Sequence, residues 1–324
     1  MNYEDIIRRF SKLSVLVLGD VMLDEYNFYY SKDNRPSPEK QDKMVHLIKN
    51  SRITLGGAGN VAANLASLGV STKFITLCGN DGNFFHLNQL MDKMGIESFS
   101  LPDPKRPTTV KRRFYGDDKY LFRFDLESKE KIDNSFSNKI LDEFKKMVYG
   151  VDAVILSDYN KGLFTESLSR EIIDMCKDIP VIVDFKPENK SYFYKADIIS
   201  PNYKEAKIIQ PSFNMNNLEE EVKKLRDELR SKSLVVTLGK EGVCGYNGLS
   251  FFHIPANKVN VVDEVGCGDT VRSVLTLGYL SGLSLKESAE LANYAAAVVI
   301  QKIGTATINQ DELIEIIGKT SHLL

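Results

Sequence analysis

The sequence is poor in the residues that form metal clusters, disulfides and histidine-based catalytic sites. Four cysteines occur in 324 residues, far apart and without a C-x-x-C pair, namely Cys78, Cys176, Cys244 and Cys267. Neither a zinc site nor a disulfide framework is therefore predicted. The histidines are equally few and scattered, at His46, His86, His253 and His322. A histidine metal site and a catalytic triad built on histidine are therefore not expected.

The chain also lacks an excess of charge of one sign and any long apolar run. Its 42 basic and 44 acidic residues leave a net charge of −2, which gives no reason to expect nucleic acid or an anionic membrane as a partner. Charged residues occupy positions near the N-terminus where a signal peptide would be apolar, and no later stretch could span a bilayer. We therefore expect a cytoplasmic protein with reduced thiols, which must hold any anionic ligand in a local cluster of cations.

Short apolar runs alternate with amphipathic helical segments along most of the chain. A run of valine and leucine at 15–18 ends at a glycine, and similar runs at 153–156, 181–183 and 234–238 each follow a helical pattern. This alternation predicts an α/β fold with a mostly parallel, doubly wound sheet flanked by helices. The length suits one large domain, and without repeats or a linker we expect that domain to span 1–324.

Two stretches interrupt the alternation and predict a small inserted β flap. Residues 26–55 contain an aromatic run, a polar segment with two prolines and two strand-like runs, and residues 107–125 have the pattern of a hairpin. A flap of this kind can close over a site and exclude water from it. Its exposed aromatic residues also predict a surface for a homodimer.

Polar residues gather immediately after the predicted strands, where open α/β sheets place their ligands. We therefore expect the site to include Asp24, Asp158, Lys161, Lys186, Asn202, Glu205 and Thr237. Asp24, which follows the first strand, is a candidate for holding substrate hydroxyls. A solvated loop acid is an equally good explanation of this residue by itself.

One β-branched run in the last third of the chain gives way to glycines and then to a helix. Apolar residues recur at helical spacing after Asp269, so a helix is predicted to begin there, with Arg272 on its polar side. Tight turning and the helix dipole create an anion site from the backbone amides of Gly266, Cys267 and Gly268. A carboxylate beside a bound phosphate suits a base that takes the proton of an attacking hydroxyl, and we assign this role to Asp269. A helix cap after a glycine turn is the alternative.

A second glycine-rich turn has two interpretations. Gly57-x-Gly59-x-x-Ala62, with Asp81 about 20 residues on, matches the dinucleotide fingerprint of an oxidoreductase. That fingerprint belongs in the first βα turn of its domain, whereas here a strand and a flap precede it. We therefore favour a sugar site, in which Asn60 offers both a donor and an acceptor to hydroxyls.

Three motifs resemble those of the ribokinase-like (PfkB) carbohydrate kinases, and the resemblance covers nearly the whole chain. They are Gly57-Ala58-Gly59-Asn60, Ser200-Pro201-Asn202-x-x-Glu205 and Asp263-x-x-Gly266-x-Gly268-Asp269. The stretches 19–24, 156–162 and 302–307 are similar to the D-glycero-β-D-manno-heptose 7-phosphate kinases of lipopolysaccharide-core precursor synthesis. The resemblance implies an ATP- and Mg²⁺-dependent kinase that phosphorylates the anomeric O-1 of a heptose 7-phosphate. Bifunctional relatives carry a nucleotidyltransferase domain after the kinase, which this chain is expected to lack.

The resemblance also implies roles for individual residues. Asp269 would be the base, and the anion hole would be formed by Gly266, Cys267 and Gly268. Sugar hydroxyls would be bound by Asp24, Gly56, Gly57 and Asn60. The nucleotide would lie near Asn202, Glu205, Thr237, Gly239, Gly242 and Asn293. Glu205 would organise Mg²⁺, directly or through water, and similar kinases bind a monovalent cation such as K⁺ near 263–265.

A sugar that already carries a phosphate needs a fixed group of cations. We expect these from the flap and the strand-end loops, namely Lys111, Arg113, Arg123, Lys161 and Lys186. Arginine suits bidentate binding of phosphate. Solvated surface charges are the alternative explanation for each of these residues.

The chain departs from the usual Asp-Val-Thr-Gly-Ala-Gly-Asp motif at Glu264, Val265 and Cys267, and the flap differs at 35–41. Cys267 is either a reactive thiol at a helix N-terminus or a small packing residue. Because the flap covers the sugar, a kinase for another sugar or sugar phosphate, of the ribose or fructose type, is an alternative function. A non-catalytic sugar-phosphate sensor is another, which the retention of Asp269 and both glycines disfavours.

Overall fold

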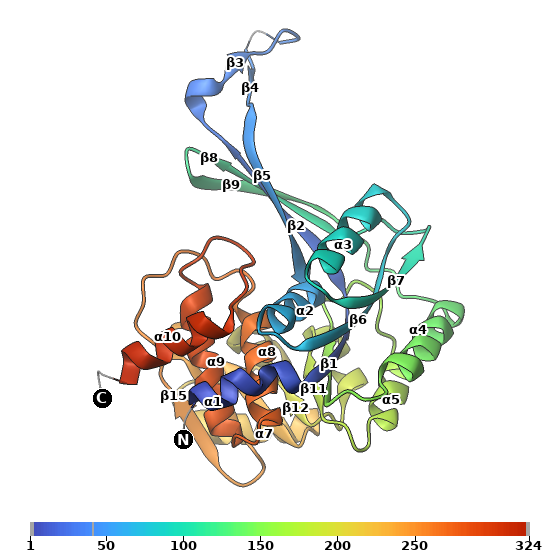
Figure 1. Cartoon of the computed structure of the whole chain (residues 1–324), viewed down its shortest axis with the longest axis vertical. Helices are drawn as coiled ribbons and strands as arrows, with labels where there is room; N and C mark the ends of the chain where they lie inside the picture. The colour runs from blue at the N-terminus through green and yellow to red at the C-terminus, as the bar shows by residue number, and fades with distance from the viewer. Residues whose placement is uncertain (1–2, 41, 322–324) are drawn as a thin grey trace.

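The predicted buried strands form one large sheet that is mostly parallel. The computed structural model describes residues 3–40 and 42–321 (Figure 1). In this part of the chain, nine strands lie in the order β15 (Phe251–Ile254), β14 (Val243–Tyr246), β13 (Ser233–Thr237), β12 (Ile198–Ile199), β11 (Val181–Asp184), β10 (Ala153–Ser157), β1 (Ser14–Gly19), β6 (Ser71–Gly79) and β7 (Glu97–Asp103). Neighbours from β13 to β7 are parallel, and β14 and β15 add an antiparallel edge.

Alternate residues of the central strand β1 enter two separate hydrophobic cores, one on each face of the sheet. Val15 and Val17 belong to the first core, which is covered by α1 (Tyr3–Arg8), η1 (Arg9–Lys12), α2 (Ala58–Ser67), α3 (Gly82–Lys93), α8 (Cys267–Leu280), α9 (Leu285–Val299) and α10 (Gln310–Ser321). Leu16 and Leu18 belong to the second, which is covered by α4 (Asn134–Met147), α5 (Glu166–Met175), η3 (Pro187–Phe193), α6 (Tyr203–Ile209) and α7 (Leu218–Leu229). Burial on both faces explains why the strand is a continuous apolar run.

A second, four-stranded sheet rises above the main body and forms the flap (Figure 1). Its strands lie in the order β5 (Ile48–Gly57), β2 (Val21–Tyr29), β8 (Val110–Gly116) and β9 (Lys119–Leu126). Beyond them, η2 (Ser31–Asp33) leads to a short ribbon of β3 (Arg35–Pro36) and β4 (Met44–Val45). Strand β2 pairs antiparallel with β5 and parallel with β8, so the flap joins stretches far apart in the sequence. Residue 41 of the flap lies outside the described residues.

The predicted fold class is confirmed, but two local expectations are wrong. Asp24 was expected in a loop after β1, whereas it lies in strand β2, because the chain passes from one sheet to the other with only Asp20 between them. The helix expected to begin at Asp269 begins at Cys267 instead. Its N-cap, Gly266, has φ = 78°, a left-handed conformation that favours glycine. Among the described residues, no helix combines the length and apolarity that crossing a bilayer requires.

Candidate active site

Polar residues from the carboxyl ends of neighbouring strands meet the start of α8 in one cleft. Tyr159 follows β10 and Asn202 follows β12, while Asp184 and Thr237 are the last residues of β11 and β13. Parallel strands end at the same edge of a sheet, which explains how residues so far apart in sequence meet. The cleft has a volume of about 140 Å³ and is lined by Tyr159, Asp184, Lys186, Asn202, Glu205, Thr237, Gly266, Gly268, Asp269 and Arg272.

At the start of α8 the backbone amides of Gly266 and Gly268, two residues that line this cleft, have no partner in the described part of the chain. The amide of Cys267 donates to the carbonyl of Glu264 at 3.3 Å, so it is occupied by the preceding loop. The carbonyl of Gly266 accepts from the amide of Asp269 at 3.1 Å. Within the described residues the amide of Gly268 has no partner, and Gly268 lines the cleft. Of the two amides at 267 and 268, only that of Gly268 is therefore free to bind an anion at the helix N-terminus.

The carboxylate of Asp269 is buried and held on both oxygens. Tyr159 donates its hydroxyl to Oδ1 at 2.6 Å, and Arg272 donates Nη2 to the same oxygen at 2.8 Å. Asn60, in the first turn of α2, donates Nδ2 to Oδ2 at 2.9 Å. The predicted sugar-binding residue Asn60 therefore also fixes the orientation of the predicted base.

Arg272 is buried between two carboxylates, although the sequence only placed it on the polar side of the helix. Its Nη2 lies 2.8 Å from Asp184 as well as 2.8 Å from Asp269. Burial raises the pKa of Asp184 to about 7, although the positive charge of Arg272 opposes this shift. The second oxygen of Asp184, Oδ1, is buried without a hydrogen-bond partner in the described part of the chain. This oxygen and the guanidinium are groups that a ligand could satisfy.

Two lysines lie near the ring of Tyr159. The Nζ atoms of Lys186 and Lys111 lie 5.0 Å and 5.9 Å from the centre of its ring. Burial, followed by the nearby charge of Asp269, raises the pKa of the Tyr159 hydroxyl, so it stays protonated and donates. Tyr159, Asp184 and Arg272 had no assigned role in the sequence analysis. A signal for Arg272 existed, since it follows Asp269 by three residues, the spacing of a helical ion pair.

The predicted sugar-binding residues lie where β2, β5 and β8 meet. Asp24 and Arg113 form a buried ion pair at 2.5 Å. A side chain at Gly56 would come within 2.2 Å of Asp24 Oδ2, so glycine is required for this arrangement. Gly57, with φ = 58°, is the N-cap of α2 and pairs with Val21 of β2. Gly56 and Gly57 therefore shape the site through their backbone.

The five predicted phosphate-binding cations differ in how they are paired. Lys161, Lys186 and Arg123 contact Glu127, Glu205 and Asp125 at 2.5, 2.5 and 2.7 Å, and Arg113 contacts Asp24. Among the described residues, only Lys111 of the five has no ion pair. Burial lowers the pKa of Lys111. A cation that is partly desolvated and unpaired is the best placed of the five to bind an added anion.

Asp158 lies behind the cleft and does not line it. Its carboxylate accepts hydrogen bonds from Asn189 Nδ2 at 2.8 Å and from the backbone amide of Asn160 at 2.7 Å. Burial, and then repulsion from Asp20, raise the pKa of Asp158 to about 7. Through these contacts Asp158 holds the loop that carries Tyr159.

The residues predicted near the nucleotide fall into two groups. Asn202 and Glu205 form a reciprocal capping box at the start of α6, and both line the cleft together with Thr237. The remaining three, Gly239, Gly242 and Asn293, are not among the residues that line it. Gly239 begins η4 (Gly239–Glu241), and Asn293 of α9 donates to the carbonyl of Pro255 at 2.8 Å.

The thiol of Cys267 is part of the packing around α8. It contacts the first hydrophobic core, and burial raises its pKa to about 12. A neutral thiol is a poor nucleophile at physiological pH, so the structure favours the packing role over the reactive one.

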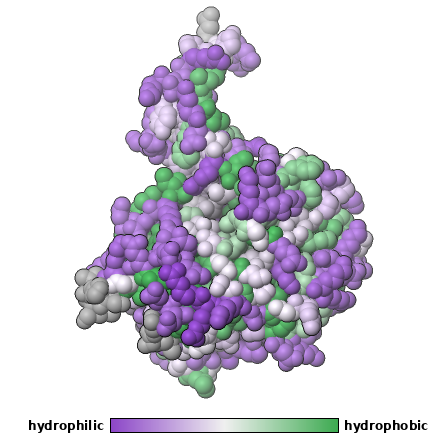
Figure 2. Space-filling view, viewed as in Figure 1, coloured by the Kyte–Doolittle hydropathy of each residue, from purple (hydrophilic) through white to green (hydrophobic). Residues whose placement is uncertain are grey.

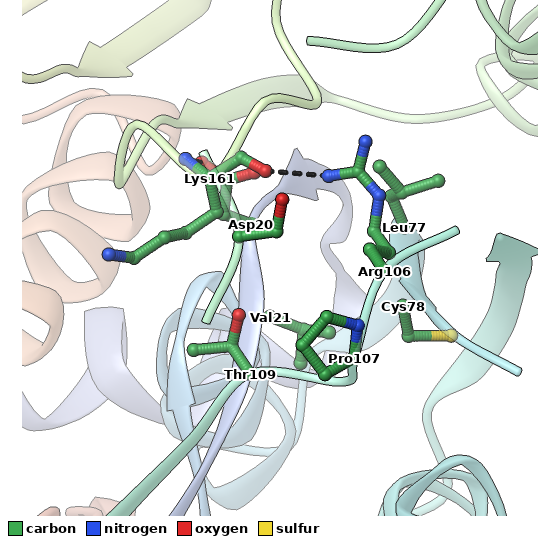
Figure 3. A pocket seen from close by; sticks show the side chains of 9 residues that line it. Asp20, Val21, Leu77, Cys78, Arg106, Pro107, Thr109 and Lys161 are labelled. Carbon is green, nitrogen blue, oxygen red and sulfur yellow. Dashed lines mark hydrogen bonds between the residues drawn. The ribbon is translucent and has the colours of Figure 1, made fainter. Parts of the chain in front are cut away.

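A smaller niche is lined by Asp20 and eight other residues (Figure 3). Its volume of about 10 Å³ has room for roughly one water molecule. Arg106 closes it by donating to the carbonyl of Lys161 at 2.8 Å, and Val21 and Pro107 contribute apolar walls. A sugar or a nucleotide does not fit this niche, so the cleft at α8 is the candidate active site.

Comparison with known proteins shows the family of the chain. The family model of the pfkB family carbohydrate kinases matches residues 12–312. The bifunctional protein HldE from Nitratiruptor sp. is 38% identical over 94% of this chain, and HldE from Desulfatibacillum aliphaticivorans is also 38% identical over 94%. The chain spans 65% and 63% of the length of these two relatives.

Solved structures share the fold at low sequence identity. Phosphofructokinase-2 from Escherichia coli, in complex with potassium, superimposes with a TM-score of 0.77 at 18% identity over 95% of this chain and 99% of its own. Ribokinase from Thermotoga maritima gives 0.68 at 23% identity over 94% and 99%. With the family model covering most of its length, the chain belongs to the pfkB family of carbohydrate kinases and is a phosphotransferase that acts on an alcohol group.

Proposed function

We propose that the protein is an ATP-dependent kinase that phosphorylates the anomeric O-1 of D-glycero-D-manno-heptose 7-phosphate. The product would be the 1,7-bisphosphate, made in the cytoplasm for lipopolysaccharide-core or other heptose precursor synthesis. The motifs at 19–24, 156–162 and 302–307 and the similarity to HldE proteins support this substrate. One observation supports an acceptor that already carries a phosphate. Lys111, beside Tyr159, is a partly desolvated cation without an ion pair among the described residues.

The chemistry follows from the residues around the start of α8. The acceptor hydroxyl would approach Asp269, which accepts its proton as the oxygen attacks the terminal phosphorus of ATP. Asn60 keeps the carboxylate oriented through Oδ2, while Oδ1 exchanges its bond with Tyr159 for one with the substrate. The free amide of Gly268 would stabilise the negative charge on the phosphoryl oxygens.

Two carboxylates of the cleft support the binding of a Mg²⁺·ATP complex. Oδ1 of Asp184 is buried without a partner, and oxygen is the ligand that Mg²⁺ prefers. Asp184 and Glu205 would hold the ion, directly or through water, beside Asn202 and Thr237. When bound, Mg²⁺ neutralises charge on the phosphates. Glu205 already uses its oxygens for Lys186 and for the cap of α6, which favours a water-mediated contact for this residue.

A monovalent cation such as K⁺ is proposed for the loop at 263–265. Asp263 anchors this loop by accepting from the amides of Val265 at 3.0 Å and Gly304 at 2.9 Å. The neighbouring structure of phosphofructokinase-2 was solved with potassium, which supports testing K⁺ first.

The flap provides the surface for a proposed homodimer. Strand β9 is exposed along its whole length, including Phe122, which stacks on Phe114, and Phe124, which meets Phe114 edge-on. Figure 2 shows apolar atoms among polar ones on the protruding flap. An exposed aromatic edge strand of this kind is a surface that a second copy can cover.

The test is turnover of heptose 7-phosphate against unphosphorylated heptose, ribose and fructose 6-phosphate, with ADP release as the readout. We expect kcat/KM to be highest for heptose 7-phosphate. A higher value for another acceptor would overturn the proposed substrate and favour a kinase for that sugar. The departures from the family motif at 264, 265 and 267 and in the flap at 35–41 would then explain the different specificity. Binding of a sugar phosphate without ADP formation would favour the sensor.

A further inference from the structure

Arg272 is a buried arginine whose guanidinium lies in the catalytic cleft, one helical turn after Asp269. Its side chain is 8% exposed and lines the cleft beside Gly268 and Lys186. An arginine is rarely buried unless its donors are paired. Here both carboxylate contacts, to Asp184 and Asp269, are made by the single nitrogen Nη2.

The protein itself leaves the rest of the guanidinium unused. Nε is buried and has no hydrogen-bond partner among residues 3–40 and 42–321, and no hydrogen bond of Nη1 is present there. The guanidinium stands over Gly268, since a side-chain carbon built on that glycine would lie 3.5 Å from Nη1 and 3.6 Å from Nη2. Three N–H groups of Arg272 and the free amide of Gly268 are therefore close together. Such a planar array of donors matches the oxygens of a phosphoryl group.

We propose that Arg272 binds the phosphoryl group during its transfer and stabilises the charge that develops on it. The proposal rests on the proposed function, the transfer of a phosphoryl group from ATP to an acceptor hydroxyl. The acceptor oxygen forms a bond to the terminal phosphorus of ATP, and the bond from that phosphorus to the bridging oxygen breaks, with its electron pair leaving on ADP. The hydroxyl proton passes to Asp269. Arg272 keeps its contact with Asp184 and gives up the one with Asp269 for the phosphoryl oxygens.

The transfer of the Arg272 contact from Asp269 to the phosphoryl group also frees Asp269 when the substrate is bound. In the ligand-free structure Oδ1 of Asp269 already accepts from both Arg272 and Tyr159, which leaves it poorly able to take a proton. A bound phosphoryl group competes for the guanidinium and withdraws one of these two donors. The base thus becomes available only when the group to be transferred is in place.

The test compares Arg272→Met, Arg272→Lys and Arg272→Ala with Arg226→Met, a matched variant of an arginine on α7 outside the cleft. Steady-state kinetics give kcat and KM, and calorimetry gives the affinity for ATP and for ADP with tetrafluoroaluminate, a planar mimic of the phosphoryl group. We expect Arg272→Met to lower kcat about 10²- to 10³-fold with little change in KM for ATP. Tight binding of ADP with tetrafluoroaluminate should be lost, and guanidinium ion should partly restore kcat of Arg272→Ala.

Three outcomes overturn the proposal: an unchanged kcat of Arg272→Met, equal losses of affinity for ATP and for the planar mimic, or full activity of Arg272→Ala without guanidinium. Thermal unfolding of each variant against Arg226→Met shows whether a loss comes from misfolding, and Arg272→Lys then tests the geometry with the charge retained. Full activity of Asp269→Asn would overturn the role of Asp269 as the base, but it would not contradict the proposed role of Arg272. If the wild-type protein phosphorylates none of the sugars, the proposed function fails, and the planar-mimic affinities alone decide the role of Arg272.

Discussion

The hydroxyl of Tyr159 lies 2.6 Å from Oδ1 of Asp269, so a residue that follows strand β10 holds the carboxylate at the start of α8. Asn60 on α2 holds the other oxygen of that carboxylate. Three segments that are far apart in the sequence thus position the carboxylate of Asp269. We expect removal of this carboxylate to lower kcat more than it lowers the free energy of unfolding.

Asp269→Asn should abolish most of the phosphoryl transfer. The amide keeps the shape of the side chain but cannot accept the proton, and general-base catalysis contributes about 10²- to 10⁴-fold. We expect kcat to fall by that factor in an ADP-release assay, with a circular dichroism spectrum like that of the wild type. Asp311→Asn, at an exposed aspartate of α10, is the control and should keep its kcat. A folded Asp269→Asn variant with near-normal kcat would show that another group accepts the proton.

Lys111→Met should weaken the binding of a phosphorylated acceptor selectively. One charged hydrogen bond contributes about 1.5–3 kcal/mol, so KM for the sugar phosphate should rise about 10- to 150-fold. KM for the unphosphorylated sugar should stay the same, because it has no phosphate to lose. Lys119→Met, at an exposed lysine of the same flap, is the matched control. Equal effects on both sugars would place the phosphate elsewhere.

Asp24→Ala should destabilise the folded protein strongly. Asp24 and Arg113 are 4% and 7% exposed, and removing one partner of a buried pair costs about 3–5 kcal/mol because the other charge is left uncompensated. Urea denaturation should show this loss in the free energy of unfolding. Glu219→Ala, which breaks an exposed pair with Lys223, should cost less than about 1 kcal/mol. The double variant Asp24→Ala/Arg113→Met should recover part of the loss, and a loss of similar size in Glu219→Ala would contradict the assignment.

Asp158 should make stability depend on pH. Its pKa is about 7 in the folded protein and 3.8 ordinarily, so the folded state binds the extra proton and gains stability from it below about pH 4. This contribution is lost as the pH rises from about 4 through 7. Asp158→Asn should therefore show a flatter dependence of the unfolding free energy between pH 5 and 8 than the wild type or Asp174→Asn, an exposed control on α5. Parallel curves for all three proteins would rule out Asp158 as the source.

Phe124→Asp should dissociate the proposed homodimer. Phe124 is 64% exposed on β9, and a buried charge in the centre of an interface is costly. Light scattering after size-exclusion chromatography should show a dimer for the wild type and a monomer for the variant. Leu249→Asp changes a leucine that is 91% exposed outside the flap and should leave the mass unchanged. A monomeric wild type at micromolar concentration would end the dimer proposal.

The fold could be predicted from the sequence because burial on both faces leaves a clear pattern. The run at 15–18 is apolar throughout, since Val15 and Val17 face one core and Leu16 and Leu18 the other. The position of Asp24 was harder to predict, because Asp20 looks like the end of a strand and the chain continues as a strand of the other sheet.

The candidate site was only partly predictable. Glycines and strand ends indicated the cleft, since both are local features of the sequence. Arg272 was not assigned, because a helical pattern separates polar from apolar sides but does not say that the polar side of α8 faces buried carboxylates such as Asp184. Long-range pairing of this kind depends on the packing of α8 against strands more than 80 residues earlier.

The direct passage from β1 into β2 has a mechanical consequence. Asp20 is the only residue between the two sheets, and its carboxylate is held by the backbone amides of Tyr159 at 2.9 Å and Lys161 at 3.0 Å. A tilt of the flap that moved Asp20 would therefore also move the segment that carries Tyr159. The sheet that holds Asp24 and the phenol that donates to Asp269 are thus linked through one buried aspartate.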